Sequence, residues 1–251
     1  MKPSLDQITA VILAGGFGTR VQHLLRDVPK PMASVAGKPF LEWVVRYVGR
    51  QAIHQAMIST GYLAETIERH FQTQQVKGVT VRCVPETEPL GTAGGFLNAA
   101  RTSGEKPAAW LVLNGDSLAL ASLCDIVTKM ADPQVAGVLL GVSVSDTSRF
   151  GTIEYDAAGN LLAFKEKTSA AGVINAGIYL FRNSALELFP SHRPLSFEKE
   201  VFPVLLKQGV KLKVHVTNAP FLDIGTPESL QQAEAFIREG LPHFSVQGSE
   251  V

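Results

Sequence analysis

The sequence predicts an α/β fold: a doubly wound, mostly parallel sheet with a small β-rich insertion or lid. Through the first 145 residues, short apolar runs alternate with segments of helical periodicity. This alternation is typical of βαβ units, whose right-handed crossovers place helices on both faces of a parallel sheet. After residue 145 the rhythm changes to charged, hairpin-like stretches. Sheets of this kind bind ligands at the carboxyl ends of their strands, so candidate site residues are sought there.

The expected elements of the first half follow from bounded apolar runs and from apolar residues at helical spacing. Short runs rich in Val, Ile and Leu are typical of strands that are buried on both faces. The expected strands fall at 8–14, 55–60, 79–84, 109–114 and 137–144. The expected helices lie between them, at 40–51, 63–72, 92–101 and 120–131.

The second half opens with a predicted hairpin in GTIEYDAAGNLLAFKEK, residues 151–167. Its two strand-like runs flank Asp156–Asn160, where Asp, Gly and Asn favour a turn. The apolar run 173–181 and the alternating run 210–216 indicate two further strands, and 196–209 contains a helix.

The last predicted helix begins at Thr226-Pro227. Threonine is a favoured N-cap, and proline at the first helical position has no N–H that the helix would need. The chain shows no low-complexity linker and no internal repeat. We therefore interpret residues 1–241 as a single domain with halves at about 8–145 and 146–241, and residues 242–251 as a frayed C-terminal tail.

The charge balance and composition exclude several classes of protein. The 251-residue chain carries 23 Lys+Arg and 23 Asp+Glu, so its formal net charge is zero. A neutral chain has no general attraction to nucleic acid or anionic membranes, and neither is expected as a partner. No apolar stretch approaches the roughly 20 residues that span a bilayer, and the N-terminal run is too short for a secretory signal. Cys83 and Cys124 form no metal-binding pattern, and a reducing cytoplasm is the expected compartment.

A glycine-rich loop, Ala14-Gly15-Gly16-Phe17-Gly18-Thr19-Arg20, follows the first predicted strand. Three positions without Cβ atoms let backbone amides approach phosphate oxygens closely. The loop matches neither the Walker pattern nor the dinucleotide pattern GxGxxG, so a plain turn is the alternative. Arg20 and Lys30 favour phosphate binding, because arginine grips phosphate through two N–H groups and lysine is a compact point charge. Pro29 and Pro31 restrict the backbone on either side of Lys30.

The motif LAGGFGTR…PKP resembles the signature of the sugar-1-phosphate nucleotidyltransferases, also called sugar nucleotide pyrophosphorylases. The resemblance implies a Rossmann-like nucleotidyltransferase fold and the transfer of a nucleotidyl group from a nucleoside triphosphate to a sugar 1-phosphate, with release of pyrophosphate. It implies that Arg20 and Lys30 are catalytic, because this pair neutralises charge at the α-phosphate in that family. The nucleotide-binding residues that it implies in the loop are Leu13, Ala14, Gly15, Gly16, Gly18 and Thr19. The resemblance also implies that the first half, about 8–145, binds the nucleotide and that the second half, about 146–241, binds the sugar phosphate.

A second glycine cluster, PETEPLGTAGG, leads from the third predicted strand into a helix. It is similar to the family segment E-x-x-P-L-G-T-A-G, which lies against the nucleobase. The resemblance implies that Glu86, Gly91, Thr92 and Ala93 bind the nucleotide, with Glu86 accepting or orienting hydrogen bonds at the edge of the base. A tight turn that caps a helix is the alternative.

Two aspartates are candidate metal ligands. Asp116 follows an apolar strand in LVLNGDSL, and Asp223 precedes the last helix in FLDIGTP. Mg²⁺ prefers oxygen ligands and keeps several waters. The resemblance implies that Asp116 and Asp223 bind Mg²⁺, the expected cofactor, and that Asp116 belongs to the catalytic set. Taken singly, each aspartate is equally typical of a turn.

The sugar-phosphate side is implied by three further matches. FKEK is similar to an E-K segment in which glutamate contacts sugar hydroxyls and lysine the sugar 1-phosphate; NAGIY is similar to a sugar-binding strand, and RFG lies beneath the sugar. The substrate-binding residues that the resemblance implies are Asn114, Gly151, Glu166, Lys167 and Asn175. Glu198 in SFEKEVFP is a further, weaker candidate. An exposed strand end rich in charge is the alternative for FKEK.

The segments KPFL and ISTGYLAETIERHF are most similar to the D-glycero-α-D-manno-heptose-1-phosphate guanylyltransferases. This similarity implies GTP as donor and a GDP-heptose product for bacterial surface polysaccharide, such as capsule or lipopolysaccharide. A UTP- or dTTP-dependent enzyme for glucose, mannose or N-acetylmuramate 1-phosphate is the alternative, as is a catalytically silent regulatory subunit. Family members form dimers or tetramers, which leaves a homo-oligomer open.

Overall fold

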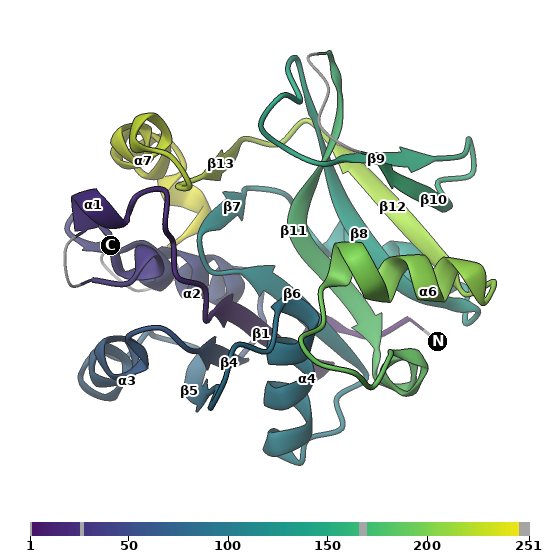
Figure 1. The fold of residues 1–251 in the computed structure, drawn as a ribbon, viewed down its shortest axis with the longest axis horizontal. Helices are drawn as coiled ribbons and strands as arrows, with labels where there is room; N and C mark the ends of the chain where they lie inside the picture. Colours follow the sequence, from purple (N-terminus) through teal and green to yellow (C-terminus); the bar gives the residue numbers. More distant parts are fainter. Residues whose placement is uncertain (1, 26–27, 166–169, 246–251) are drawn as a thin grey trace.

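The structure is a computed structural model that describes residues 2–25, 28–165 and 170–245. In these ranges nine strands form one mixed sheet with the order β10-β9-β11-β6-β1-β4-β5, and β8 and β12 extend it beside β11 (Figure 1). The strands of this sheet are β1 (Ile8–Ala14), β4 (Gln55–Thr60), β5 (Thr80–Pro85), β6 (Ala109–Asn114), β8 (Val135–Val144), β9 (Thr152–Tyr155), β10 (Leu161–Lys165), β11 (Gly172–Arg182) and β12 (Lys211–Thr217). Two small ribbons complete the β structure: β2 (Ser34–Val35) with β3 (Lys38–Pro39), and β7 (Ser117–Ala119) with β13 (Phe221–Asp223).

Helices connect most of the parallel strands. The α-helices are α1 (Gln22–Leu25), α2 (Phe40–Arg50), α3 (Ala64–Thr73), α4 (Thr92–Ser103), α5 (Leu123–Thr128), α6 (Phe202–Lys207) and α7 (Pro227–Glu239). Short 3-10 helices lie at Leu5–Gln7, Lys30–Met32, Lys129–Ala131, Asn183–Leu188 and Leu241–His243, and a π-helical turn lies at Phe197–Val201. Parallel pairing joins β5, β4, β1 and β6, and it also joins β8 and β12. The predicted α/β class with a mostly parallel sheet is confirmed.

The long strand β11 joins the two halves of the chain. It pairs antiparallel with β6 through Ile178–Arg182, with β8 on its other edge, and with β9 through Ile174. Its register against β8 shifts between Asn175 and Tyr179. Such an irregularity bends a strand and re-aims side chains, and this one lies in the middle of the predicted sugar-binding segment.

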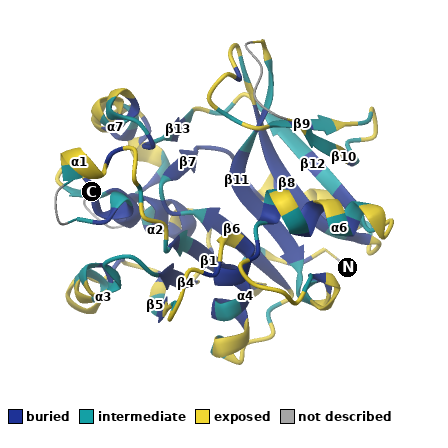
Figure 2. Ribbon diagram, in the orientation of Figure 1, coloured by how far each residue is buried: buried dark blue, intermediate teal, exposed yellow. Residues whose placement is uncertain are grey.

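The sheet is covered on both faces, as a doubly wound fold requires. Along β1, Ala10 and Ile12 belong to a core shared with α2, α3, α5 and α7, whereas Val11 belongs to a second core shared with α4 and α6. Successive side chains of a strand point to opposite faces, so the two cores lie on opposite sides of the sheet. Figure 2 shows the central strands buried and the outer faces of the helices exposed.

Local sequence signals account for several element ends. The turn at Asp156–Asn160 closes through the carboxylate of Asp156, which accepts hydrogen bonds from the backbone N–H and the side chain of Asn160. The hydroxyl of Thr226 accepts from the N–H of Ser229 and caps α7, as predicted. The predicted helix 120–131 is shorter, because residues just before it form β7 and extend to meet β13; α5 begins only at Leu123.

The ordered packing continues into the segment predicted as a tail. Phe244 is fully buried, and its ring lies 5.3 Å from that of Trp43 in an edge-on contact. The hydrophobic core therefore extends at least to Phe244, beyond the boundary placed at residue 242. The rest of the predicted tail, 246–251, lies outside the described residues.

In the described ranges, no helix has both the length and the apolar character that a membrane span needs.

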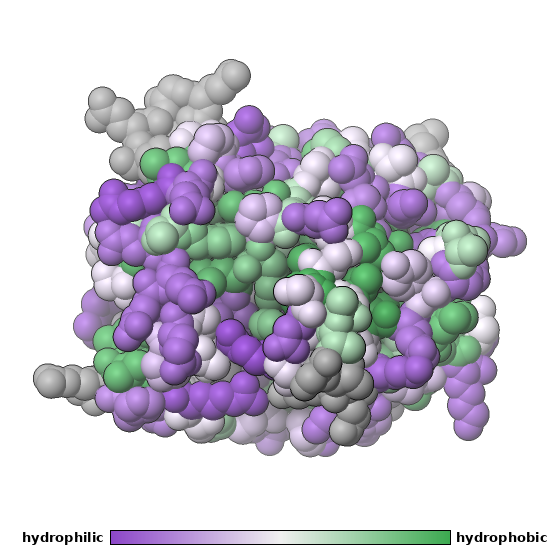
Figure 3. Space-filling view, turned by 90° about the horizontal axis from the view of Figure 1, so that it is seen from above, coloured by the Kyte–Doolittle hydropathy of each residue, from purple (hydrophilic) through white to green (hydrophobic). Residues whose placement is uncertain are grey.

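Figure 3 shows the surface of the molecule that faces upward in Figure 1. Hydrophobic residues gather near the centre of this surface, and hydrophilic residues surround them.

Candidate active site

The glycine-rich loop leaves the carboxyl end of β1 and forms one wall of a cavity of about 350 Å³. This phosphate cavity, as we call it, brings residues from both halves of the chain together. It is lined by Leu13, Ala14, Gly16, Gly18, Thr19, Arg20, Lys30, Pro31, Asp116, Asp223 and Gly225. All three residues predicted to be catalytic and both predicted metal ligands therefore face one space.

Two glycines of the loop are required by close neighbours. Gly18 has a φ of +60°, a left-handed conformation that favours glycine, and a Cβ there would lie 2.7 Å from the Cβ of Lys30. A Cβ on Gly15 would lie 2.7 Å from Oε1 of Glu86. Gly16 differs, because no atom lies within 4 Å of the position its Cβ would take. Its lack of a side chain leaves space over the backbone, where a ligand can approach.

Lys30 is held at the start of a short 3-10 helix between two prolines. Pro29, with a φ of −65°, is the residue before this helix, and Pro31 is buried within it. The lysine Nζ lies 2.8 Å from Oδ2 of Asp116 and 3.8 Å from Oδ2 of Asp223. Only 11% of its side chain is exposed, so the ammonium group is held inside the cavity and directed at the carboxylates.

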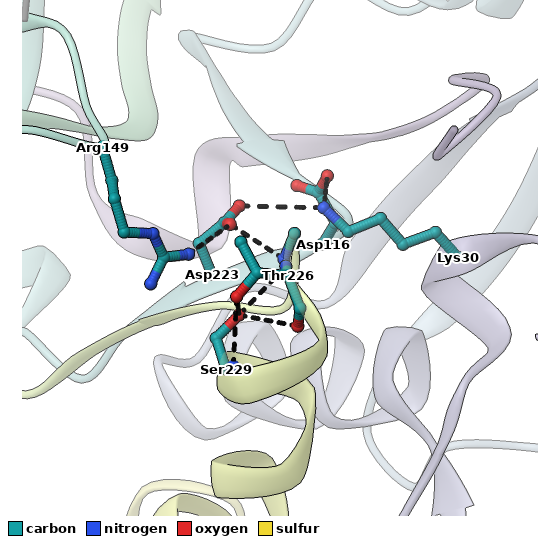
Figure 4. Close-up of polar contacts among 7 residues, drawn as sticks. Lys30, Asp116, Arg149, Asp223, Thr226 and Ser229 are labelled. Carbon is teal, nitrogen blue, oxygen red and sulfur yellow. Dashed lines mark hydrogen bonds and ion pairs between the residues drawn. The ribbon is translucent and has the colours of Figure 1, made fainter. Parts of the chain in front are cut away.

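The pairing of β7 with β13 brings the two aspartates together. Ser117 is opposite Asp223 in this antiparallel ribbon, and the N–H of Ile224 donates to the carbonyl of Asp116 at 3.0 Å. The two residues are more than 100 positions apart in the sequence, yet their backbones are neighbours. Because the ribbon fixes both backbones, the carboxylates converge on Lys30 (Figure 4).

Asp223 lies in an environment that disfavours its charged form. Burial and the nearby negative charge of Asp116 raise its pKa, and the opposing effects of Lys30, the Gly225 N–H and Arg149 do not fully offset them. The N–H of Gly225 donates to Oδ1 at 2.9 Å. A Cβ on Gly225 would clash with this carboxylate and lie 3.1 Å from the Lys30 Nζ, so a side chain here would have to displace both groups.

The donor set fits a magnesium ion. Mg²⁺ is commonly held by one or two carboxylates together with substrate phosphates and water. Asp116 and Asp223 supply two carboxylates beside a cavity large enough for phosphates, and the mutual repulsion that raises the pKa of Asp223 is what a divalent cation relieves. The residues present therefore fit the predicted cofactor, and Asp116 and Asp223 are the residues that would hold it.

A second cavity of about 310 Å³, here called the base cavity, adjoins the phosphate cavity and shares Leu13, Gly16 and Asp116 with it. It is lined by Leu13, Gly15, Gly16, Phe17, Glu86, Pro89, Gly91, Thr92, Asn114 and Asp116. Three of its lining residues, Gly15, Gly16 and Gly91, are glycines. A flat ring can lie against such a surface, because no side chain projects from the glycines.

Glu86 is held in place inside the base cavity. Its Oε1 accepts from the hydroxyl of Ser59 at 2.8 Å, and its Oε2 accepts from the N–H of Leu90 at 3.1 Å. The carboxylate lies between Gly15 and Gly95, where a Cβ on either glycine would come within 2.7 Å of Oε1. Each of the two oxygens accepts one hydrogen bond from the protein, and a carboxylate oxygen can accept more than one.

The first backbone N–H groups of α4 are hydrogen-bonded to Leu195, in the segment that precedes the π-helical turn and α6. Gly91 has a φ of +76°, and the N–H groups of Ala93 and Gly94 both donate to the carbonyl of Leu195. The hydroxyl of Thr92 accepts from the N–H of Phe197 at 3.1 Å and lines the base cavity. Ala93, predicted to contact nucleotide, is fully buried and lines neither cavity.

On the sugar-phosphate side, Asn175 belongs to a hydrogen-bonded cluster with Tyr179 and Glu198. The side-chain amide of Asn175 donates to Tyr179 Oη at 2.7 Å and to Glu198 Oε1 at 3.2 Å, and the Tyr179 hydroxyl donates to Glu198 Oε1 at 2.9 Å. Burial and the charge of Glu198 raise the pKa of Tyr179 well above its usual value, so its hydroxyl stays protonated. The π-helical turn at Phe197–Val201 carries Glu198, and such turns are frequent at functional sites.

Asn114 and Gly151 both lie close to residues 175–177 of β11. Gly177, with a φ of +70°, faces Asn114 so closely that a Cβ would clash with the asparagine amide. Asn114 lines the base cavity. The carbonyl of Gly151 accepts from the N–H of Asn175 at 3.2 Å, and a Cβ on Gly151 would have room. Glu166 and Lys167, the predicted sugar and phosphate contacts, lie outside the described residues.

Several residues around the cavities were not among the predicted site residues. Ser59 and Leu90 orient Glu86, Gly225 lets Asp223 and Lys30 approach, and Arg149 lies 3.8 Å from Asp223. Gly225 follows Asp223 by two residues, so the glycine itself was a signal. Arg149 and Leu90 lie within the RFG and PETEPLGTAGG segments, which carried no prediction for these two residues themselves, and no local pattern marks Ser59.

Comparison with known proteins gives consistent matches across most of the chain. The nucleotidyl transferase family model matches residues 9–240. A mannose-1-phosphate guanylyltransferase of Mycobacterium tuberculosis is 34% identical over 238 residues, which cover 94% of this chain and 66% of that protein. A D-glycero-alpha-D-manno-heptose 1-phosphate guanylyltransferase of Aneurinibacillus thermoaerophilus is 32% identical over 90% of this chain and 96% of its own length.

Solved structures show the same relationship in three dimensions. The crystal structure of HddC from Yersinia pseudotuberculosis, complexed with GMP-PN, superimposes with a TM-score of 0.81 at 31% identity. The match covers 91% of this chain and 99% of that one. Together with the converging carboxylates, the cationic loop and the two adjoining cavities, these matches establish that the chain belongs to the nucleotidyl transferase family, as a sugar-1-phosphate nucleotidyltransferase.

Proposed function

We propose that the protein transfers a guanylyl group from GTP to a sugar 1-phosphate and releases pyrophosphate, with D-glycero-α-D-manno-heptose 1-phosphate as the favoured acceptor. The observation that carries the reaction type is the phosphate cavity, in which Arg20 and Lys30 face Asp116 and Asp223. The product, a GDP-heptose, fits the predicted role in bacterial surface polysaccharide synthesis. A cytoplasmic reaction, where GTP is available, agrees with the sequence-based expectation.

The chemistry requires positioning and charge neutralisation more than proton transfer. A phosphate oxygen of the acceptor attacks the α-phosphorus in line, the bond from that phosphorus to the bridging oxygen breaks, and pyrophosphate leaves with the bonding electrons. The acceptor phosphate is already anionic near neutral pH, so no general base is needed. Arg20 and Lys30 stabilise the negative charge that builds on the triphosphate as the bond breaks.

The carboxylates of Asp116 and Asp223 are the proposed ligands of Mg²⁺. When bound, the ion supplies positive charge that offsets the phosphate oxygens. Lys30, whose ammonium group lies near both carboxylates, lines the same cavity and would direct its charge at phosphate. The loop at Gly15–Gly18 contributes backbone N–H groups that phosphate oxygens can approach closely.

The choice of guanine is supported by Glu86. The edge of guanine that pairs in duplexes presents two adjacent donors, N1–H and N2–H₂, whereas uracil and thymine present a single N3–H between two carbonyl oxygens. A carboxylate accepts and does not donate, so it suits the two guanine donors and repels a flanking carbonyl. Glu86 lines the base cavity, and each of its oxygens accepts a single hydrogen bond from the protein.

The acceptor sugar is proposed from the relatives and from the cluster on the sugar-phosphate side. Two of the matched proteins are named heptose 1-phosphate guanylyltransferases, and one of them covers this chain almost end to end. Asn175 and Glu198 supply an amide and a carboxylate of the kind that binds sugar hydroxyls. Mannose 1-phosphate is the second candidate, because the mycobacterial mannose-1-phosphate guanylyltransferase is 34% identical.

Pyrophosphate release tests this proposal directly. The purified protein is incubated with Mg²⁺ and each combination of GTP, UTP, dTTP and ATP with heptose, mannose, glucose and N-acetylmuramate 1-phosphates. Turnover with GTP and the heptose substrate at the highest kcat/KM is the expected result. Turnover with UTP but not GTP overturns the guanylyl assignment, and a preference for mannose 1-phosphate overturns the heptose assignment alone. Absence of turnover with every pair overturns the enzymatic function.

A further inference from the structure

Arg149 approaches Asp223 from the side opposite Lys30 (Figure 4). Its Nη2 atom lies 3.8 Å from Oδ1 of Asp223, whereas the Lys30 Nζ lies 3.8 Å from Oδ2 of the same carboxylate. The proposed metal ligand is therefore placed between two cations. Lys30 comes from the nucleotide half of the chain, and Arg149 comes from the sugar-phosphate half.

Aromatic packing fixes the position of Arg149. Its guanidinium lies over the ring of Phe150, 5.3 Å from the centroid. The Phe150 ring packs edge-on against Phe221, with centroids 5.5 Å apart. Phe221 belongs to β13, the same short strand as Asp223. Phe150 and Phe221 therefore connect the guanidinium of Arg149 to β13, the strand that carries Asp223.

The backbone around Arg149 is tied to the sugar-binding strand. The N–H of Phe150 donates to the carbonyl of Thr147 at 3.0 Å, which closes the turn that carries Arg149. Directly after the turn, the carbonyl of Gly151 accepts from the N–H of Asn175 at 3.2 Å. A substrate held at Asn175 therefore lies on the same structural unit as this arginine.

The contact with Asp223 leaves the guanidinium able to bind a ligand. Direct hydrogen bonds between ionised groups span about 2.7–2.9 Å, so a separation of 3.8 Å is not a closed contact. The Arg149 side chain is 45% exposed, and exposed ion pairs of this kind are weak. Arg149 also lines a cavity of about 240 Å³ that shares Asp223 with the phosphate cavity, and this cavity includes the polar side chains of Ser143 and Gln232.

We propose that Arg149 binds the phosphate group of the sugar 1-phosphate, an inference that rests on the function proposed above. A phosphate monoester must approach a triphosphate that is itself strongly negative, so it needs a cation on its own side of the reaction centre. Arginine offers a planar set of donors that binds two phosphate oxygens at once. The pair with Asp223 orients the guanidinium before substrate binds, and the phosphate then replaces this distant partner.

Steady-state kinetics of Arg149→Gln and Arg149→Lys test the inference. With GTP and a sugar 1-phosphate that the wild type uses, the KM for sugar 1-phosphate should rise about tenfold or more in Arg149→Gln, as expected for the loss of a charge-assisted hydrogen bond. Arg149→Lys keeps the charge and should recover part of the loss, while the KM for GTP stays within about twofold in both. Arg101→Gln, at an exposed position near the end of α4, is the matched control and should change neither constant.

A second measurement separates phosphate binding from a purely orienting role on Asp223. Binding of Mn²⁺, used as a paramagnetic substitute for Mg²⁺, is measured by electron paramagnetic resonance in the presence of GTP and without acceptor. An unchanged Mn²⁺ affinity with a raised KM for sugar 1-phosphate supports the inference. A changed Mn²⁺ affinity with an unchanged KM overturns it. Turnover by the wild type together with a wild-type KM in Arg149→Gln overturns this inference alone, whereas absence of turnover by the wild type overturns the proposed function as well.

Discussion

The Nζ atom of Lys30 lies 2.8 Å from Oδ2 of Asp116, a contact that joins residues 86 positions apart. The same ammonium group is within 4 Å of Asp223, so one lysine serves two converging carboxylates. Lys30 therefore supplies positive charge to both carboxylates, which are also the proposed ligands of the metal ion. Replacing Lys30 and replacing Asp223 are therefore expected to change the free energy of unfolding in opposite directions.

Replacing Lys30 with methionine should destabilise the ligand-free protein and nearly abolish turnover. Asp116 would be left without its close cation, and losing the partner of a part-buried charge lowers the free energy of unfolding by about 1–3 kcal/mol. Loss of one preorganised group that stabilises transition-state charge lowers kcat by about 10²- to 10³-fold. Thermal denaturation with and without Mg²⁺ checks the first expectation, because added Mg²⁺ should restore stability more in Lys30→Met than in the wild type.

The matched control for this variant is Lys38→Met. The Nζ of Lys38 lies 4.0 Å from Glu42, which also pairs with Arg46 at 2.9 Å, so this change should alter the unfolding free energy by less than about 0.5 kcal/mol. Equal stability losses in the two lysine variants would contradict the role given to Lys30 as an internal counter-ion.

Asp223→Asn should make the ligand-free protein more stable at neutral pH and inactive. The pKa of Asp223 is raised, chiefly by burial and then by the charge of Asp116, so the folded state binds a proton at this carboxyl more readily than the unfolded state does. Stability from this group is therefore present at low pH and is lost as pH rises through the folded-state pKa. Asparagine removes the penalty and can keep the bond from the Gly225 N–H.

The pH dependence of the melting temperature provides the control for Asp223→Asn. The difference in melting temperature between Asp223→Asn and the wild type should narrow as the pH falls from 7 towards about 4, because the wild-type carboxyl then becomes protonated. A variant less stable than the wild type at neutral pH would show that the ion pairs of Asp223 outweigh its burial.

Sequence patterns predicted most strands of the sheet, because apolar runs are local signals. The resemblance to a known family, and not the local pattern alone, predicted Arg20, Lys30, Asp116 and Asp223, which line the phosphate cavity. Apolar runs mark buried strands, and the glycines with the proline-flanked Lys30 mark the loop. The pairing of β7 with β13 was not predicted, since each strand has three residues and gains its stability from a partner about 100 positions away. The hydrogen bonds that Ser59 and Leu90 make with Glu86, and the close approach of Gly225 to Asp223, were not predicted for the same reason. These contacts form only when the chain is folded.

Gly15→Ala and Gly16→Ala form a matched pair that separates folding from ligand approach. A Cβ at Gly15 would lie 2.7 Å from Glu86 Oε1 and must displace that carboxylate, whereas a Cβ at Gly16 meets no atom within 4 Å. Gly16→Ala should leave the melting temperature unchanged and still raise the KM for GTP, because phosphate oxygens approach that backbone closely. Gly15→Ala should lower both the melting temperature and kcat/KM. Wild-type kinetics in Gly16→Ala would place the triphosphate elsewhere.

Glu86→Gln should weaken discrimination in favour of GTP. The amide can accept from the Leu90 N–H through its oxygen and donate to a reoriented Ser59 hydroxyl, so the local contacts survive. One acceptor for guanine is lost, and kcat/KM for GTP should fall about 10- to 100-fold, while that for UTP stays level or rises. The measurement is the ratio of the two constants with one acceptor sugar. A ratio equal to that of the wild type would remove Glu86 from base recognition.

Tyr179→Phe should impair use of the sugar 1-phosphate without affecting GTP. The Tyr179 hydroxyl stays protonated because burial and Glu198 raise its pKa, and it joins Asn175 to Glu198 through bonds of 2.7 and 2.9 Å. Its removal frees both side chains to move, so the KM for sugar 1-phosphate should rise about 3- to 10-fold and the unfolding free energy should fall by about 1 kcal/mol.

Tyr155→Phe, on the exposed β9–β10 hairpin, is the control for Tyr179→Phe and should change neither quantity. The KM for GTP distinguishes the proposed role from a general loss of structure, because a general loss of structure would raise that constant as well. A fall in stability alone, with both KM values unchanged, would make the Tyr179 cluster a structural feature of β11. A rise in the KM for GTP alone would place this cluster on the nucleotide side of the reaction centre.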